Sequence, residues 1–414
     1  MATGPLLKVH WRRPCLRARL VSVRLAMAAV AGAQPLELDA SRQQVFVIGN
    51  EAADVDSLVS AYAMAQLLDS DQVQGVALAQ IPREEFRLRG DALALFRRAG
   101  SPLAADGSPA RLVFWDEVDW EAVQSLQGRS LVLTDHNKMA AKVAQHFDGR
   151  VARVLDHHAN TQSYPDAEVI IDEALGSACT LVAEQFFGAG RPISADVGLL
   201  LAGVIILDTR NFDPKQGKGT PRDRATLDKL LEFVPPAGCD GWYDELMEAR
   251  TDVSHLSVRE LLLLDLKVAN ASDGSYIAFC SVFGTIADVC GKAGGPASLI
   301  GEAEAFADSR GYQAVVALFS KDATGDKAIA FVPGRASKRG PGVCEAIAEH
   351  LSQAAPGNFA EAFRENPLFA SQGILAEGFG FTRKEDLHPL MAFTLRGVVS
   401  RKTLLPYAMS ASAV

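Results

Sequence analysis

Acidic side chains follow apolar segments at several points in the first half of the chain. Asp54 and Asp56 come after QVFVIGN, Asp135 directly follows LVLT, and Asp208 ends the run LLAGVIIL. Each of these residues, taken alone, is also explained as a helix cap or a turn residue, roles in which aspartate is common. Their repetition after equivalent apolar segments instead predicts that the carboxylates form one cluster.

The most specific motif is VARVLDHHAN at 151–160, in which Asp156, His157 and His158 follow an apolar segment. Imidazole binds divalent transition ions well, and a neighbouring carboxylate can orient such a ligand. With the four aspartates above, His157 completes the set of oxygen and imidazole ligands that two divalent ions about 3.5 to 4 Å apart require. Such a pair of ions activates a bridging water and clamps a phosphoryl group, so the motifs predict phosphoryl hydrolysis.

The elements that must position these residues alternate between strand-like and helix-like segments. The runs QVFVIGN, ARLVFW, RSLVLTD and VARVLDHH are predicted as strands, and helices are predicted at 56–68 and 195–207. This alternation is typical of the α/β class, with a mostly parallel sheet and flanking helices. Open sheets of this kind bind ligands at the carboxyl ends of their strands, which is where the motifs lie.

A second, smaller α/β domain is predicted after a segment rich in Pro and Gly at 233–240. We predict a basic extension at 1–40, a metal-binding domain at 41–235, a linker at 236–255 and the smaller domain at 256–410. Within the smaller domain, a helix is predicted at 258–268 and another at 342–355, with strands at YIAFCSVFG, AVVALFS, KAIAFVPG and around LRGVVSRK. The active site is expected in the cleft between the two domains.

Composition limits the partners that are expected. Hydrophobic residues make up 48% of the 414-residue chain and charged residues 22%, with a net charge of -9. These values are ordinary for a globular protein and argue against binding to nucleic acid or an anionic membrane through bulk charge. The cysteines form no C-x-x-C pair, so neither a zinc knuckle nor a disulfide scaffold is expected. No transmembrane helix and no obligate protein partner are expected.

The first 36 residues contain basic but no acidic side chains: Lys8, Arg12, Arg13, Arg17, Arg19 and Arg24. This bias suits a transit peptide for a mitochondrion or plastid, although a start at Met27 explains it equally well. A secretory signal fits less well, because Arg24 interrupts the apolar stretch. A cytoplasmic location is expected, with an organelle as the alternative.

The order of the motifs resembles that of the DHH phosphoesterase superfamily, named for the triplet Asp156, His157 and His158, over about residues 44–405. Within the superfamily, GNEAADVDS, TDVSHLS and LLLDLK most resemble the exopolyphosphatase and prune branch, which is related to the family II inorganic pyrophosphatases. The segment GVVSRKTLLP resembles the signature of the second domain that these proteins share.

The resemblance implies two divalent metal ions, Mg²⁺ or Mn²⁺ with Co²⁺ as an alternative, and a role for each candidate residue. One ion would be bound by Asp54 and Asp135 and the other by Asp56, His157 and Asp208, with Asp135 bridging the two. His158 would contact the substrate phosphate or protonate the leaving group, and Asp156 would orient the histidine pair. Substrate phosphates would be bound by Lys267, Arg401 and Lys402.

One position departs from the pyrophosphatases, which have a histidine four residues before the first aspartate. This chain has Asn50 there, as exopolyphosphatases and prune proteins do. An amide oxygen is a neutral ligand, so Asn50 is a further candidate ligand. The site is then expected to depend less on transition metals and to accept Mg²⁺ better.

The function implied is a metal-dependent exopolyphosphatase that hydrolyses terminal phosphoanhydride bonds of inorganic polyphosphate. One alternative is a prune-like short-chain polyphosphatase or pyrophosphatase with a regulatory binding role; His158 argues against it, because animal prune departs at this histidine. Another is a DHH-type oligoribonuclease, but GKAGGPAS at 291–298 lacks the histidine of the motif that binds nucleic acid. Basic residues at 208–224 and 334–340 are candidates for a channel that would hold a long substrate.

Overall fold

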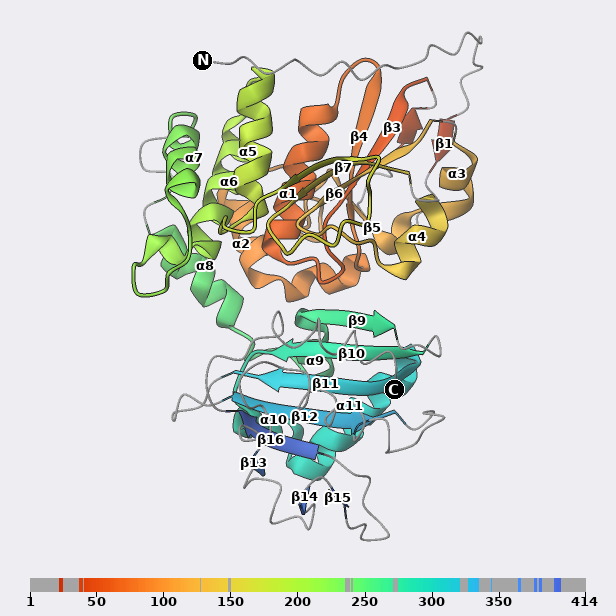
Figure 1. Cartoon of the computed structure of the whole chain (residues 1–414), viewed down its shortest axis with the longest axis vertical. Helices are drawn as coiled ribbons and strands as arrows, with labels where there is room; N and C mark the ends of the chain where they lie inside the picture. The colour runs from red at the N-terminus through yellow and green to blue at the C-terminus, as the bar shows by residue number, and fades with distance from the viewer. Residues whose placement is uncertain are drawn as a thin grey trace. The chain divides into compact units, whose positions relative to one another are not determined.

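The computed structural model describes residues 41–334 except 127, 148–149, 235–238, 240, 271–274 and 321–326, together with short pieces outside that range. The chain divides into two compact units, Met1–Arg250 and Thr251–Val414, which are described separately (Figure 1). The division falls inside the segment predicted as a linker, most of whose second half is helix α8, Trp242–Thr251.

Several predicted features lie outside the described residues. They are the basic N-terminal segment apart from strand β1 (Ser22–Arg24), the predicted helix at 342–355 apart from Cys344, the basic residues at 335–340, and the segment 396–402 with Arg401 and Lys402.

The first unit contains a six-stranded sheet in which every neighbouring pair is parallel, in the order β5-β4-β3-β6-β7-β8. The strands are β3 (Gln43–Ile48), β4 (Val73–Ala79), β5 (Leu112–Phe114), β6 (Ser130–Thr134), β7 (Val151–Asp156) and β8 (Glu168–Ile171). The predicted α/β class with a parallel sheet is therefore confirmed. Strands β4 and β8 were not predicted, since β4 contains Gly75 and β8 is a short edge strand with exposed side chains.

Helices cover both faces of this sheet (Figure 1). Side chains alternate across β3, so Val45 and Val47 join one core cluster and Phe46 and Ile48 join the other. The core on the first face takes side chains from α1 (Val55–Leu68), α2 (Gly90–Arg98), α5 (Ala178–Ala189), α6 (Ala195–Asp208), α7 (Pro221–Leu231) and α8. The second face is covered by α3 (Trp120–Ser125) and α4 (Ala141–Phe147).

The second unit is built on a mostly antiparallel sheet in the order β13-β16-β12-β11-β10-β9, in which β10 and β11 form the parallel pair. Its strands are β9 (Leu266–Asn270), β10 (Tyr276–Val282), β11 (Tyr312–Phe319), β12 (Lys327–Pro333), β13 (Arg364–Glu365) and β16 (Met391–Leu395). Its helices are α9 (Val258–Leu264), α10 (Ile286–Ala293) and α11 (Pro296–Arg310). The prediction of a smaller α/β domain is confirmed.

The helix predicted at 258–268 is wrong in its second half. Helix α9 ends at Leu264, the backbone becomes extended at Asp265, and Leu266–Asn270 pairs antiparallel with β10 as strand β9. A run of leucines satisfies a buried helix and a buried strand equally, so tertiary pairing decided the outcome. Lys267 therefore lies on an edge strand.

Two of the expected absences can be examined in the described part of the chain. None of its helices combines the length and the apolar character needed to cross a membrane. The cysteines described there, Cys179, Cys239, Cys280, Cys290 and Cys344, form no disulfide.

Candidate metal centre

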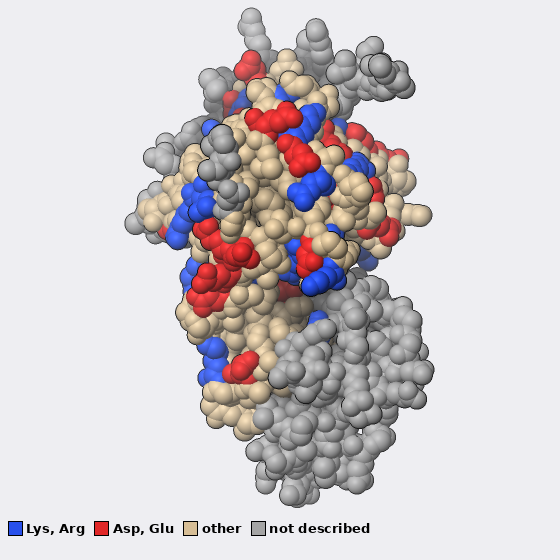
Figure 2. Space-filling model, turned by 90° about the vertical axis from the view of Figure 1, so that its left-hand side faces the viewer, with Lys and Arg blue, Asp and Glu red and all other residues tan. Residues whose placement is uncertain are grey.

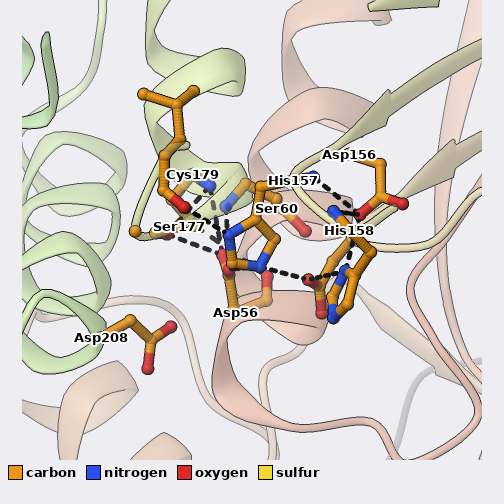
Figure 3. Close-up of polar contacts among 12 residues, drawn as sticks. Asp56, Ser60, Asp156, His157, His158, Ser177, Cys179 and Asp208 are labelled. Carbon is orange, nitrogen blue, oxygen red and sulfur yellow. Dashed lines mark hydrogen bonds and ion pairs between the residues drawn. The ribbon is translucent and has the colours of Figure 1, made fainter. Parts of the chain in front are cut away.

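Three neighbouring strands bring the candidate residues together. Strands β3, β6 and β7 are adjacent in the sheet and run parallel, so the residues that follow them meet at one edge. The loop 49–54 follows β3, Asp135 follows β6, and His157 and His158 follow β7. Figure 3 shows the two histidines beside Asp56 and Asp156.

Asp135 lies at the centre of this group. Its Oδ2 accepts hydrogen bonds from Ser57 Oγ at 2.7 Å and from Asn50 Nδ2 at 2.8 Å. Its Oδ1 faces His157 Nε2 at 3.3 Å and His158 Nδ1 at 3.6 Å. Asp135 adopts a left-handed backbone with φ of 58°, which aspartate tolerates better than most residues. The carboxylate is thus held by one oxygen while the other points at the histidines.

Contacts at the Nδ1 atom of each ring fix both histidines. His157 Nδ1 lies 3.0 Å from the carbonyl oxygen of Leu175, to which it donates, and this leaves Nε2 facing Asp135 and Asp56. His158 Nδ1 lies 2.8 Å from Asp156 Oδ1. Asp156 is fully buried, and the same oxygen accepts the backbone N–H groups of both histidines. This is the contact expected of a carboxylate that orients the pair.

Asp54 and Asp56 both bond to a helix N-terminus, but to different helices. Asp54 is the N-cap of α1, where its Oδ1 accepts the backbone N–H of Ser57 at 3.0 Å. Asp56 lies in the first turn of α1 and reaches the start of α5. There it accepts hydrogen bonds from Ser177 Oγ at 2.9 Å, Ala178 N at 2.8 Å and Cys179 N at 3.1 Å. Asp56 Oδ2 still lies within 3.8 Å of His157 Nε2, so capping does not remove it from the site.

Asp208 is the last residue of α6 and lies to one side of the other candidates (Figure 3). Among the described residues, the ligand atoms of Asp135, His157 and His158 come within 4.8 Å of one another; Asp54 and Asp56 are not members of that group, and neither is Asp208. Its Oδ1 instead lies 3.5 Å from Arg250 Nη2. Asp208 therefore belongs to the same neighbourhood but is held by a different partner.

Burial and mutual repulsion oppose the ionisation of two carboxylates in this site. Burial and the charges of Asp135 and Asp208 raise the pKa of Asp56 to about 8. Burial also raises the pKa of Asp208 to about 6, although Arg250 opposes the rise. Burial lowers the pKa of His157, but the facing Asp135 carboxylate raises it overall, to about 10. For Asp135, burial is outweighed by the histidines, which hold its pKa far below the ordinary range.

The donor set and its charge fit a divalent cation. Buried carboxylates and an imidazole with a fixed tautomer are ligands that divalent ions accept, and a bound cation would relieve the repulsion among the aspartates. The same repulsion accounts for the raised pKa of Asp56, to which the charges of Asp135 and Asp208 contribute after burial.

Asn50 differs from its predicted role as a further ligand. Its Oδ1 accepts the backbone N–H of Ala52 at 2.9 Å, and its Nδ2 faces Asp135 Oδ2 at 2.8 Å and Asp54 Oδ2 at 3.3 Å. The side chain therefore presents N–H groups to the two carboxylates and turns its oxygen away. In this arrangement Asn50 orients the carboxylates of other residues.

Sequence reasoning missed several residues that hold this site. Ser57 bonds to Asp135, Ser177 to Asp56, and Asn137 to Asp156. Buried Arg89 donates to the carbonyl oxygens of Ala52 and Ala53 in the loop that carries Asp54. The position of Ser57, three residues after the helix-capping Asp54, was a signal in the sequence that could have indicated its place in the site. The other contacts join residues far apart in the sequence, and no local pattern indicates them.

The predicted phosphate-binding residues are in the second unit. Lys267 lies half-buried on β9, opposite Phe279 of β10. Arg401 and Lys402 lie outside the described residues.

Comparison with known proteins agrees with the geometry. Residues 44–204 match the model of the DHH family, N-terminal domain, and residues 244–411 match that of the DHHA2 domain. Exopolyphosphatase PRUNE1 of Rattus norvegicus is 34% identical over 288 residues, which are 68% of this chain and 60% of the rat protein. The manganese-dependent inorganic pyrophosphatase of Methanocaldococcus jannaschii is 24% identical over 231 residues, 54% of this chain and 66% of that protein.

Two further comparisons bear on the family and the fold. A putative exopolyphosphatase of Schizosaccharomyces pombe is 30% identical over 251 residues, 57% of this chain and 63% of that protein. The crystal structure of a putative family II inorganic pyrophosphatase from Methanococcus jannaschii superimposes with a TM-score of 0.56 at 19% identity, covering 89% of this chain and 100% of that one, and so shares the fold. The chain belongs to the DHH phosphoesterase superfamily, in the branch that holds the exopolyphosphatases and prune proteins.

Proposed function

We propose that this protein is a metal-dependent hydrolase of phosphoanhydride bonds, with inorganic polyphosphate as its substrate. The observation that carries the proposal is the meeting of Asp54, Asp56, Asp135 and His157 at one sheet edge, with Asp208 beside them. The names of the relatives, exopolyphosphatase and inorganic pyrophosphatase, support the class of reaction. The chain spans 60% of the length of the rat relative.

Two divalent ions are part of the proposal. Asp54 and Asp135 would hold one ion, Asp56, His157 and Asp208 would hold the other, and Asp135 would lie between them. When bound, such ions lower the pKa of water and accept charge from phosphoryl oxygens. We expect Mg²⁺ or Mn²⁺, with Co²⁺ as an alternative, since relatives include proteins named manganese- and cobalt-dependent inorganic pyrophosphatases.

The chain's own residues would orient the substrate and handle its proton. Because Asp156 holds His158 through Nδ1, the Nε2 atom is the ring nitrogen available to a phosphate oxygen. We propose that this nitrogen contacts the substrate or gives its proton to the leaving phosphate. Lys267, Arg401 and Lys402 would bind substrate phosphates, whose negative charge grows on the leaving group as the bond breaks.

The length of the substrate depends on basic residues beyond the metal site. On the face drawn in Figure 2, basic and acidic side chains lie interspersed. Arg222, one candidate for a channel, is engaged by Asp172 at 2.7 Å and by Glu184 at 2.5 Å. Lys215 and Lys218 are exposed in the loop that follows Asp208. These two lysines are therefore better candidates than Arg222 for contact with a long chain.

Phosphate release by the purified protein tests the proposal. Long-chain polyphosphate, tripolyphosphate, pyrophosphate and a short oligoribonucleotide are each supplied with Mg²⁺ or Mn²⁺. The inactive variant is Asp135→Asn, because asparagine tolerates the left-handed backbone at this position. The control is Asp119→Asn, which changes an aspartate that caps α3 outside the site.

We expect release from long chains that is lost in Asp135→Asn and kept in Asp119→Asn. Release from the short phosphates alone would assign a pyrophosphatase or short-chain enzyme in place of an exopolyphosphatase. No release from any phosphoanhydride, with either ion, would refute the proposal.

A further inference from the structure

Arg250 joins three helices beside the metal centre. It lies in the last turn of α8, and its Nε contacts Asp91 Oδ2, in the first turn of α2, at 2.6 Å. Its Nη2 lies 3.5 Å from Oδ1 of Asp208, the last residue of α6. All three side chains are largely buried, with 18% of Arg250, 10% of Asp91 and 21% of Asp208 exposed. The guanidinium thus links a candidate metal ligand to a second carboxylate that is not one.

Backbone packing fixes the position of Arg250. At the other end of α8, Trp242 is buried against Gly203 of α6, where an added Cβ would lie 3.0 Å from the indole ring. Next to Arg250, an added Cβ at Gly90 would lie 2.3 Å from the carbonyl oxygen of Ala249. Helices α6 and α2 therefore approach α8 as closely as glycine permits. This close packing of α8 on α2 and α6 holds the Arg250 guanidinium beside Asp208.

The charges suit a role in orientation. Asp91 neutralises Arg250, so the pair as a whole adds little net positive charge that would repel a cation at Asp208. The guanidinium fork still donates N–H groups in fixed directions and can contact two carboxylates at once. Because it lies at Oδ1 of Asp208, the other oxygen, Oδ2, remains for a metal ion.

We propose that Arg250 is a positioning residue: it holds the Asp208 carboxylate in the orientation that binds a divalent ion, and Asp91 in turn holds Arg250. This inference rests on the proposed function, because it takes Asp208 as a metal ligand. Outer contacts of this kind typically change metal affinity by about 10- to 100-fold.

The test is a titration of the whole chain with Mn²⁺ in the absence of substrate. Binding is measured by calorimetry and by the electron paramagnetic resonance signal of the unbound ion. We expect Arg250→Met to weaken one of two bound ions by about 10- to 100-fold and to leave the other unchanged. Arg250→Lys keeps the charge but not the fork, so its affinity should fall between those of Arg250→Met and the wild type. At saturating Mn²⁺, kcat of Arg250→Met should approach the wild-type value.

The matched control is Arg98→Met. Arg98 of α2 pairs with Glu245 of α8 at 3.0 Å, so it joins the same two helices, but on the exposed surface. We expect this variant to bind both ions as the wild type does. Should Arg250→Met fold poorly, Asp91→Asn removes the charge that holds Arg250 and is expected to weaken the same ion.

Each outcome decides between the proposals. Wild-type affinities in Arg250→Met, or equal losses in Arg250→Met and Arg98→Met, would overturn the positioning role and leave the proposed function intact. A wild-type protein that binds no Mn²⁺ or Mg²⁺ would refute the proposed metal site itself, and this inference with it.

Discussion

Ser57 offers the clearest measurement of how the fold holds the metal centre. Its hydroxyl donates to Asp135 Oδ2 at 2.7 Å and accepts the backbone N–H of Asn50 at 2.8 Å, and the residue is 1% exposed. One small side chain thus joins the loop after β3 to the carboxylate after β6. The variant Ser57→Ala removes both bonds and little volume.

The expected loss of stability follows from these two contacts. A buried N–H without an acceptor costs about 1 to 3 kcal/mol, and a lost bond to a charged group costs about 1.5 to 3 kcal/mol. Alanine favours the first turn of α1 more than serine does, which returns about 0.5 kcal/mol. We therefore expect Ser57→Ala to lower the free energy of unfolding by about 3 kcal/mol.

The assay is urea denaturation of the metal-free protein, followed by tryptophan fluorescence. All tryptophans of the chain precede residue 251, so the signal reports on the first unit. The control is Ser60→Ala, one turn further along α1: Ser60 is equally buried, but its hydroxyl donates only to the carbonyl oxygen of Ser57 in the same helix, at 3.2 Å. We expect this control to change stability by less than about 1 kcal/mol.

A loss in Ser57→Ala no greater than that in Ser60→Ala would show that the bridge from Ser57 to Asp135 does not stabilise the fold. In addition, we expect Ser57→Ala to weaken Mn²⁺ binding by about 10-fold, because one oxygen of Asp135 loses its donor.

Two further predictions concern protons and orientation. Asp56 and His157 have pKa values raised to about 8 and about 10, so the folded metal-free protein binds more protons than the unfolded chain. Its stability should therefore fall as the pH rises from 6 to 9. Over the same range the affinity for Mn²⁺ should rise, and binding of the ion should release protons. Denaturation measures the stability, and calorimetry in buffers of different ionisation enthalpy measures the affinity and the protons released. An affinity for Mn²⁺ that does not change with pH would contradict the prediction. Asn137 donates to Asp156 and to the carbonyl oxygen of Ala159. Asn137→Ala should therefore lower kcat about 10-fold, because His158 would be misplaced. Its Mn²⁺ affinity should stay near the wild-type value. The control is Asn160→Ala, in the loop after β7 that Asn137 contacts. An unchanged kcat in Asn137→Ala would rule out the role of Asn137.

The meeting of the motifs could be predicted from the sequence because it follows from topology. Residues that come directly after parallel strands must emerge at one edge of the sheet, whatever the order of the strands. Asp54, Asp135 and His157 all follow such strands, so strand prediction alone placed them at the same edge; they lie close together because β3, β6 and β7 are neighbours in the sheet. Asp208 is different: it ends a helix, and its place in the site depends on how α6 packs.

The supporting contacts could not be predicted in the same way. Ser177 reaches Asp56 across 121 residues of sequence, and Arg250 reaches Asp91 across 159. Such contacts require the strand order and the packing of helices on one face, which no local pattern encodes. The prediction of helix through residue 268, where the structure has strand β9, was wrong for a related reason: a leucine-rich segment fits a helix until its partner strand is known.

Capping and metal binding, which the sequence presents as competing explanations for Asp54 and Asp56, are compatible in the structure. Asp56 accepts three hydrogen bonds from the start of α5, and these contacts aim its carboxylate at His157. The start of α5 therefore orients the ligand, and the ligand caps the N-terminus of that helix. It follows that Asp56→Asn would disturb α5 as well as the metal site, because an amide nitrogen would face an N–H donor. Loss of activity in that variant would not isolate metal binding. Asp135 tests the metal site more directly, because it caps no helix and asparagine tolerates its left-handed backbone.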